Sequence, residues 1–319
     1  MEEKSMTKRR LFLTLALSMV AVTAFGAGGA EGDMSSELRI GGATVGGAYY
    51  PMAQGIATLV TDYADGLSMV AVVTGGSVEN PRLVDSKEVE MGLTNANLAY
   101  FAYNGKPPYE KKLNVAGVAA LYPSVLNMFV LDNSSIQGFE DLKGKRIAVG
   151  PAGGGTLSYL RVLLAEHGMS LDDITPSYLS YADGFSQLTD GNVDAAMALA
   201  GYPASAVTQA QATHGLRPIT ISQKMMDQVV EKYPYYSQIK IPRSAYNLDR
   251  EYTFMGVMNV LIIQADMPED QVYAITSAVF DNLEEFAATN ANAAQIDPKA
   301  AAQTPIPLHA GAKRYFDEQ

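Results

Sequence analysis

A strand, a glycine-rich loop and a helix follow one another in the same order at two places in this sequence, and this repeat constrains the fold most. In the first copy, a strand-like segment at 37–40 leads through glycines to a helical pattern over 52–60. In the second copy, a segment at 145–149 leads through three glycines to a helical pattern over 157–164. Apolar residues three and four positions apart are typical of a helix packed on a sheet. The alternation predicts an α/β fold with a mostly parallel sheet.

Corresponding strands in the two copies keep nearly the same spacing. Ile147 follows Ile40 by 107 residues, and Val193 follows Val89 by 104 residues. Because these offsets nearly agree, they predict two lobes of similar topology. Chance similarity between two α/β units is the alternative interpretation.

Two long apolar stretches, at 115–131 and 254–264, are expected between the two lobes. Each is long enough to cross from one lobe to the other as an extended hinge strand. We therefore expect lobe 1 to contain residues 37–122 plus 256–319, and lobe 2 to contain residues 123–255. The expected architecture is two mixed or parallel sheets with flanking helices, joined by the hinge strands.

The clearest helical pattern begins at Pro268 and Glu269. Its apolar residues run from Val272 to Phe286 in steps of three and four. This spacing predicts one continuous helix over that range.

Residues 1–30 have the layout of a cleaved secretory signal. Four basic residues precede an apolar run at 11–22, and small residues follow it. A membrane anchor is the alternative, but a span needs about 20 apolar residues, which this run does not supply. We expect cleavage between Gly26 and Ala30. Removal of residues 1–26 takes away four basic and two acidic residues and changes the net charge from −11 to −13.

The composition excludes several classes of function. The 34 acidic against 23 basic residues argue against a nucleic-acid partner, because neutralising phosphates needs clustered Lys and Arg. Cysteine is absent, which excludes disulfides, thiolate metal sites, a cysteine nucleophile and the lipidated Cys of a lipoprotein. With three histidines, histidine-based sites are also poorly supplied. We expect no metal, no cofactor and no catalytic residue.

The two glycine loops are the best candidates for a binding site. Each places backbone N–H groups at a helix N-terminus, where free donors and the positive end of the helix dipole attract an anion. The loop at 150–156 has neither the Lys of a P-loop nor the G-x-G-x-x-G spacing of a dinucleotide site. A tight turn without a ligand is the alternative for a single loop, but two such loops, one opening each lobe, favour ligand contact.

Polar side chains follow a predicted strand at 89–93. Asn95 and Asn97 stand where its carboxyl end meets the next helix, and ligands of open α/β sheets bind outside such strand ends. Capping of the helix that begins near Leu98 is the alternative, and one residue can do both.

Ser77 and Tyr49 are weaker candidates. Ser77 lacks the nucleophile-elbow pattern, because Glu79 stands where that motif has Gly. We expect Ser77 to cap the helix that runs through Val84, with a hydroxyl that can still face a ligand. Tyr49 can cover a cleft while it donates its hydroxyl. Pairing of a carboxylate with Arg82, Arg161 or Arg243 is also possible in principle, although solvent exposure is the more usual role at such positions.

Seven segments, in this order, resemble those of the TAXI-type solute receptors of tripartite ATP-independent periplasmic (TRAP) transporters. They are GGATVGGAYYP (41–51), TGGSVEN (74–80), NANLAYFAYNG (95–105), VGPAGGGT (149–156), GNVDAAMALAGYP (191–203), MGVMNVLIIQADMPEDQVYAIT (255–276) and PLHAGAKRYFDE (307–318). They extend over nearly the whole chain after the predicted signal.

The resemblance implies a periplasmic, type II-like binding protein with two α/β lobes that close on a small anionic solute. Such receptors pass the solute to a sodium-coupled membrane permease and catalyse no reaction. Known members of the family bind small carboxylates, glutamate among them. We expect this chain to act as a monomer. By matching position, the ligand-binding residues are Thr44, Gly46, Gly47, Tyr49, Ser77, Asn80, Asn95, Asn97, Gly154, Gly155, Thr156, Gly201 and Pro203.

Three positions depart from the pattern of that family. Asn97 stands where the family often has an acid, which weakens recognition of an ammonium group and leaves room for a carboxylate without an amine. Gly154 replaces a Ser and removes one hydroxyl. Ala310 replaces a Pro, and we expect this change to affect packing only.

Two other classes of function remain as alternatives. A periplasmic enzyme on the same two-lobed scaffold needs a nucleophile with a paired base, and no motif in the sequence supplies one. A ligand-sensing domain needs a transmembrane or effector segment, for which the sequence shows no pattern.

Overall fold

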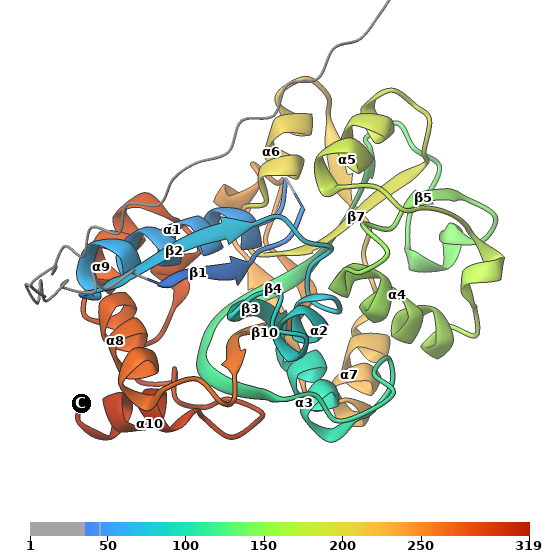
Figure 1. Cartoon of the computed structure of the whole chain (residues 1–319). Coiled ribbons are helices and arrows are strands. Elements are labelled where there is room, and N and C mark those ends of the chain that lie inside the picture. Colours follow the sequence, from blue (N-terminus) through green and yellow to red (C-terminus); the bar gives the residue numbers. More distant parts are fainter. Residues whose placement is uncertain (1–35, 45) are drawn as a thin grey trace, which may run out of the picture. The chain divides into compact units, whose positions relative to one another are not determined.

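The computed structural model describes residues 36–44 and 46–319, and the secretory signal expected at residues 1–30 lies outside the described residues (Figure 1). The described residues form a mixed α/β fold in which helices flank one sheet of ten strands. Within this part of the chain, no helix is both long and apolar enough to cross a membrane.

The elements of the described residues follow one another from β1 to α10. The strands are β1 (Ser36–Gly41), β2 (Leu67–Val72), β3 (Met91–Asn95), β4 (Val115–Leu131), β5 (Arg146–Ala148), β6 (Thr175–Ser177), β7 (Ala195–Ala200), β8 (Leu216–Pro218), β9 (Tyr236–Ile241) and β10 (Tyr252–Gln264). The helices are α1 (Tyr49–Tyr63), α2 (Asn80–Asp85), α3 (Ala96–Asn104), α4 (Gly155–Glu166), α5 (Tyr181–Thr189), α6 (Ser205–Gln211), α7 (Gln223–Lys232), α8 (Glu269–Phe280), α9 (Leu283–Thr289) and α10 (Ala310–Asp317).

The sheet has the strand order β2-β1-β3-β10-β4-β7-β5-β6, with β8 paired to β4 and β9 paired to β10. Strand β1 is parallel to β2 and β3, and β5 is parallel to β6 and β7. Strands β10 and β4 separate these two parallel groups and run antiparallel to each other and to their neighbours β3 and β7. The expectation of a mostly parallel sheet is therefore wrong at the centre, where the two long strands reverse direction.

Both long apolar stretches are the central strands of this sheet. The stretch predicted at 115–131 is β4 with the same bounds, and the second stretch lies within β10. Almost every residue of these strands is buried, because helices cover both faces and leave no polar face. Hydrogen bonding is therefore continuous from one parallel group to the other, through the strands that the sequence predicted as connections.

Helix α1 shows why the repeated helical patterns fold as they do. Its residues Met52, Ile56 and Val60 are fully buried against the sheet. A Cβ at Gly55 would lie 2.2 Å from the ring of Phe286, so only glycine lets α9 pack this closely on α1. The apolar spacing thus sets which face is buried, and the glycine sets how near the neighbouring helix lies.

The helix predicted from Pro268 to Phe286 is two helices, α8 and α9. The side-chain nitrogen of Asn282 donates to the carbonyl of Ala278 at 2.9 Å, and the backbone of Asn282 lies at φ −113° and ψ 24°. A local side-chain bond of this kind competes with the backbone bond of the same residue. The apolar residues Val272, Ile275 and Phe286 are nevertheless buried as their spacing predicts.

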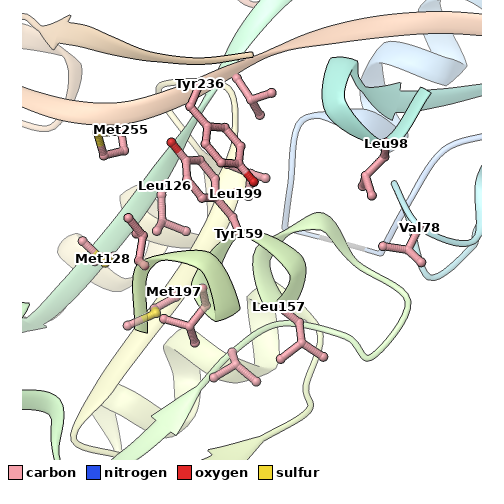
Figure 2. Packing of buried hydrophobic residues seen from close by; sticks show 14 of the residues in the cluster. Val78, Leu98, Leu126, Met128, Leu157, Tyr159, Met197, Leu199, Tyr236 and Met255 are labelled. Atoms are coloured by element: carbon pink, nitrogen blue, oxygen red, sulfur yellow. The ribbon is translucent and has the colours of Figure 1, made fainter. Parts of the chain in front are cut away.

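Buried apolar residues form three clusters in the described chain, and one of them joins elements from both parallel groups of strands. Val78 and Leu98 belong to the same cluster as Leu157 and Leu199 (Figure 2). Within it, the rings of Tyr159 and Tyr236 stack with centroids 3.9 Å apart. The core therefore continues across the segments that the sequence assigned to separate lobes.

A buried histidine caps the last helix and makes stability depend on pH. Nδ1 of His309 accepts from the N–H of Gly311 at 3.2 Å, and Nε2 donates to the carbonyl of Met267 at 3.0 Å. Burial lowers the pKa of His309, although the bond to Met267 acts in the opposite direction. The folded state thus holds this imidazole neutral where the unfolded chain takes up a proton.

We expect the free energy of unfolding to fall as the pH drops from about 6.5 towards the lower pKa of folded His309, and to keep its full value above that window. His309→Asn keeps a capping side chain but does not titrate, so it should flatten this part of the profile. Urea unfolding between pH 5 and pH 8 measures the effect. The matched control is His214→Asn at an exposed histidine, and equal slopes in the two variants would contradict the assignment.

Candidate ligand-binding site

Three loops, which follow the carboxyl ends of β1, β2 and β5, meet in the structure. We call them the α1 loop (42–48), the α2 loop (73–79) and the α4 loop (149–154), and residue 45 of the first is outside the described residues. Each leads from a strand towards the helix that gives its name. All three contribute residues to one small cavity.

The α2 and α4 loops touch through their backbones. The N–H groups of Val78 and Glu79 donate to the carbonyl of Gly153 at 3.0 and 3.3 Å. A Cβ at Gly75 would lie 3.3 Å from the Cα of Gly153. Because neither glycine has a side chain, the two loops approach more closely than other residues would allow.

The α1 loop makes a similar contact. The carbonyl of Gly46 accepts from the N–H of Ala206 at 3.1 Å. Gly46 has φ +93°, and a Cβ there would lie 2.6 Å from the nitrogen of Ala182. Glycine is therefore required at this position both by conformation and by space.

The cavity enclosed by these loops is small, with about 10 Å³ free, which is room for about one water molecule. Its walls come from the three loops, the first turns of α1 and α4, the start of α5 and the end of β7. None of the side chains that line it carries a charge. The lining residues are Ala43, Thr44, Gly47, Ala48, Tyr49, Gly75, Gly76, Ser77, Pro151, Gly154, Gly155, Tyr181 and Leu199.

A buried polar cluster lies beneath one side of the cavity. The hydroxyl of Tyr49 donates to Oδ1 of Asn259 at 2.7 Å and accepts from Nδ2 of Asn95 at 3.0 Å. The hydroxyl of Ser77 also approaches Tyr49, at 3.3 Å. Burial raises the pKa of Tyr49 far above its ordinary value, so the phenol stays neutral. The cluster therefore offers hydroxyl and amide groups and no ionised side chain.

A second cluster of buried polar groups lies on the other side of the cavity. The hydroxyls of Thr156 and Tyr181 lie 2.6 Å apart, and the N–H of Leu199 donates to Oγ1 of Thr156 at 2.9 Å. Burial raises the pKa of Tyr181 to about 12, so this phenol is also neutral near pH 7. Tyr181 thus connects the start of α4 to the end of β7.

The first turn of α4 carries no side-chain cap. Gly154 is its N-cap residue and has no side chain to offer, and Gly155 begins the helix. Helix α1, whose N-cap residue is Ala48, likewise has no side-chain cap. Both helices therefore present the positive ends of their dipoles towards the cavity.

The structure brings part of the expected residue set together around this cavity. Asn95 and Thr156 lie directly behind the lining, because Oδ1 of Asn95 is 2.2 Å from the place of a Cβ on Gly155 and Thr156 contacts Tyr181. The expected residues that line the cavity are Thr44, Gly47, Tyr49, Ser77, Gly154 and Gly155.

The other expected residues lie outside the lining. Gly46 faces Ala182, Asn97 donates to the hydroxyl of Tyr236 at 3.4 Å, Gly201 packs against Asn292, and Pro203 is exposed. The three arginines considered for a carboxylate do not line the cavity either: Arg82 donates to the carbonyl of Pro108, while Arg161 and Arg243 are exposed.

Asn80 is fully occupied in holding the strand ends. Its Nδ2 lies within hydrogen-bond distance of the carbonyls of Gly41, Gly42 and Leu93, at 3.1, 2.7 and 2.6 Å, and its Oδ1 accepts from Thr74 at 2.6 Å. The side chain therefore joins the ends of β1 and β3 to the α2 loop.

The capping role expected of Ser77 is wrong, and the capping alternative considered for Asn95 is not observed. Asn95 does occupy the N-cap position of α3, but its side chain makes no cap bond and turns towards Tyr49. Ser77 does not cap α2, whose N-cap residue is Glu79. Both side chains bond instead to Tyr49, the first residue of α1.

Sequence reasoning missed Asn259, Tyr181 and Pro151. Asn259 carried a usable signal, because it is an amide in the interior of the apolar stretch at 254–264, with apolar residues on both sides. A buried amide in such a strand needs partners from other elements. Tyr181 and Pro151 carried no comparable signal, since their place at the cavity depends on how loops distant in the sequence meet.

The fold is that of the two-lobed periplasmic binding proteins, as expected from the sequence. It is similar to PhnD1 from Prochlorococcus marinus (MIT 9301), solved in complex with methylphosphonate, with a TM-score of 0.52 and 12% identity over 89% of this chain and 96% of that one. It is also similar to a Listeria monocytogenes protein assigned to L-cystine ABC transport, with a TM-score of 0.51 and 12% identity over 82% of this chain and 98% of that one.

The chain belongs to the NMT1-like family. The model of that family matches residues 40–319, which includes every described loop and helix of the site.

Asn80→Ala should destabilise the fold, because it removes the buried amide that bonds to the carbonyls of Gly41, Gly42 and Leu93 and to the hydroxyl of Thr74. We expect the free energy of unfolding to fall by about 3 kcal/mol. Urea unfolding followed by circular dichroism measures this. Asn104→Ala is the control. It removes one hydrogen bond from a side-chain amide near the surface and should cost less than about 1 kcal/mol. A loss as small as that of the control would mean that Asn80 does not hold the strand ends.

Proposed function

We propose that this chain is a periplasmic solute-binding receptor that captures a small carboxylate and delivers it to a membrane permease. The observation that carries the proposal is the meeting of the α1, α2 and α4 loops around one cavity, with uncapped helix N-termini and neutral hydroxyl and amide groups directed to it. Such groups bind an anion without an opposite charge.

The overall charge of the chain does not oppose this binding. The net charge is −13 after the expected cleavage, but exposed charges farther from the ligand than about 8–10 Å are largely screened by salt. At the cavity itself, the N-terminal turns of α1 and α4, which carry no side-chain cap, provide the local field and the donors. The local donors therefore govern whether an anion binds.

The two expected lobes give this site a means of opening. We propose that residues 37–122 plus 256–319 form one lobe, that residues 123–255 form the other, and that β4 and β10 are the hinge. The present cavity has room for about one water molecule. Entry of a carboxylate therefore requires the α2 and α4 loops to separate, which breaks the bonds from Val78 and Glu79 to Gly153.

Binding without chemistry fits these side chains better than catalysis does. The only hydroxyl of the α2 loop that faces the cavity, that of Ser77, bonds to Tyr49, a phenol whose raised pKa makes it unsuitable as a base near pH 7. Among the described residues, no histidine or carboxylate lines the cavity to activate this hydroxyl. We therefore prefer a receptor to a periplasmic enzyme on the same scaffold.

The transporter class follows from the sequence segments quoted above. They support a TAXI-type receptor of a TRAP transporter, with export directed by residues 1–30 and solute transfer to the sodium-coupled permease of that system. The PhnD1 structure holds methylphosphonate, a small anion, which agrees with an anionic ligand but suggests a different acid group.

Thermal-shift screening of amino acids, dicarboxylates and keto acids tests the proposed function. A receptor should be stabilised by one of these solutes, and a ligand at about 100 times its Kd adds roughly 2.7 kcal/mol to the free energy of unfolding. The bound solute should remain chemically intact over hours. No stabilisation by any member of the panel, or consumption of a solute that binds, would contradict the proposal.

Gly155→Ala tests the position of the site. The new Cβ would lie 2.2 Å from Oδ1 of Asn95 and 3.1 Å from Oγ of Ser77, inside the space that the ligand needs. We expect the affinity for the solute found in the screen to fall at least tenfold by isothermal titration calorimetry.

Gly138→Ala is the control for that variant. Its new Cβ would lie 3.1 Å from the flexible carboxylate end of Glu140 and 3.9 Å from the carbonyl oxygen of Thr220, and Gly138 does not line the cavity. It should bind as tightly as the wild type. Equal affinities in the two variants, with both folded by circular dichroism, would place the site elsewhere.

A further inference from the structure

Asn259 lies where the pairing of the two central strands is irregular. It stands in β10 between Met258, which pairs with Pro123, and Val260, which pairs with Ala120. Two residues of β4 therefore oppose one residue of β10, which is a β-bulge. Such bulges re-aim side chains, and here the amide of Asn259 turns to the carbonyl of Tyr122, which it reaches at 2.7 Å.

This bond fixes which way round the amide of Asn259 lies. Only its nitrogen can donate to a carbonyl, so its Oδ1 must point to the other side. There Oδ1 accepts from the hydroxyls of Tyr49 and Ser124, at 2.7 and 2.9 Å. The same oxygen accepts from Nδ2 of Asn95 at 3.0 Å.

The orientation of Asn259 in turn fixes that of Asn95. The two residues stand directly opposite each other in the antiparallel pairing of β10 and β3. If the amide of Asn95 turned over, its oxygen would meet the oxygen of Asn259 at about the present 3.0 Å, and two acceptors would face each other. It would also meet the oxygen of Tyr49, whose hydrogen is already given to Asn259.

With its nitrogen held in this way, Asn95 turns its oxygen towards the first turn of α4. Oδ1 of Asn95 has no hydrogen-bond partner among the described residues, and the residue is 1% exposed. Its distance from the place of a Cβ on Gly155 is 2.2 Å. A buried acceptor without a partner is unfavourable, and a ligand that donates a hydrogen bond to it removes that cost.

The neighbouring groups at this point have complementary chemistry. The N-terminal turn of α4 attracts the carboxylate of a ligand, and the unpartnered oxygen of Asn95 lies beside that turn. Oγ1 of Thr44, which also lines the cavity, is likewise without a partner among the described residues. A carboxylate with a donor on the adjacent carbon satisfies both the helix and the amide.

We propose that Asn259 is a positioning residue that fixes the acceptor of Asn95 towards the site and thereby selects carboxylates that carry an amino or hydroxyl group next to the carboxylate. This inference rests on the proposed function. It adds a requirement on the ligand that the helix N-termini alone do not impose, because they attract any small anion equally.

Matched ligands of one chain length test the requirement. Glutamate and 2-hydroxyglutarate offer a donor at the adjacent carbon, glutarate offers none, and 2-oxoglutarate offers an acceptor there. Aspartate, malate, succinate and oxaloacetate repeat the comparison with one carbon fewer. We expect the donor-bearing members of at least one series to bind at least tenfold more tightly to the wild type than the other members, by calorimetry or thermal shift.

Asn259→Ala tests the positioning role, because it frees the amide of Asn95 to turn over. The ratio of affinities between donor-bearing and donor-free ligands should fall to within about threefold. Asn127→Ala is the matched control, since Asn127 is a buried amide of β4 that bonds to backbone carbonyls and to Tyr246 but not to Asn95. The control should lose comparable stability and keep the ratio of the wild type.

Two further variants keep the test decisive. If Asn259→Ala does not fold, Asn259→Ser is the milder change and should lower the same ratio. Asn95→Ala removes the acceptor itself and should abolish the preference while glutarate or succinate still binds. An unchanged ratio in the folded Asn259 variant or in Asn95→Ala would overturn the inference.

The wild-type measurements separate the two proposals. Binding of the carboxylates with equal affinity, or a preference for the oxo acids, would overturn the donor requirement and leave the receptor function standing. Absence of binding by every carboxylate in both series would instead contradict the proposed function.

Discussion

The antiparallel pairing of β4 with β10 is the contact on which the rest of the structure depends. These strands hold the two parallel groups in one sheet, and β10 also pairs with β3, whose carboxyl end leads to the site. The irregularity at Asn259 gives this pair a second role. There the side-chain amide of Asn259 reaches the carbonyl of Tyr122 and joins the buried cluster beneath the cavity. The same strands therefore connect the two halves of the molecule and orient the polar groups of the site.

The site achieves its polarity without buried charge. Its side chains are hydroxyls and amides, and the phenols of Tyr49 and Tyr181 are kept neutral because burial disfavours their ionised form. An isolated buried charge would carry a large desolvation cost, whereas helix N-termini and oriented dipoles offer a field that needs no counter-ion. Glycine makes this arrangement possible, since Gly75 and Gly153 let two backbones meet directly. The first turn of α4 can then contribute main-chain donors without obstruction.

Several features of the fold and site were predictable because they depend on local patterns. The apolar run at 115–131 predicted β4 with its observed bounds, and the spacing of Met52, Ile56 and Val60 predicted the buried face of α1. The capping role expected of Ser77 was wrong, and Asn95, for which capping was the alternative, makes no cap bond. Each side chain bonds instead to Tyr49, from another part of the chain. The single helix expected up to Phe286 was wrong for a local reason, the side-chain bond of Asn282.

The sequence by itself determined the alternation of strands and helices, the two glycine loops and the neutral character of the polar residues near them, because periodicity and residue type act over a few positions. Only the tertiary structure decided that the α2 and α4 loops touch, that Asn80 holds strand ends and that Asn259 orients Asn95. Those outcomes depend on strand register and on a bulge in the central pair, which bring residues 164 positions apart into hydrogen-bond contact. No local pattern encodes such a pairing, since it results from the packing of the whole sheet.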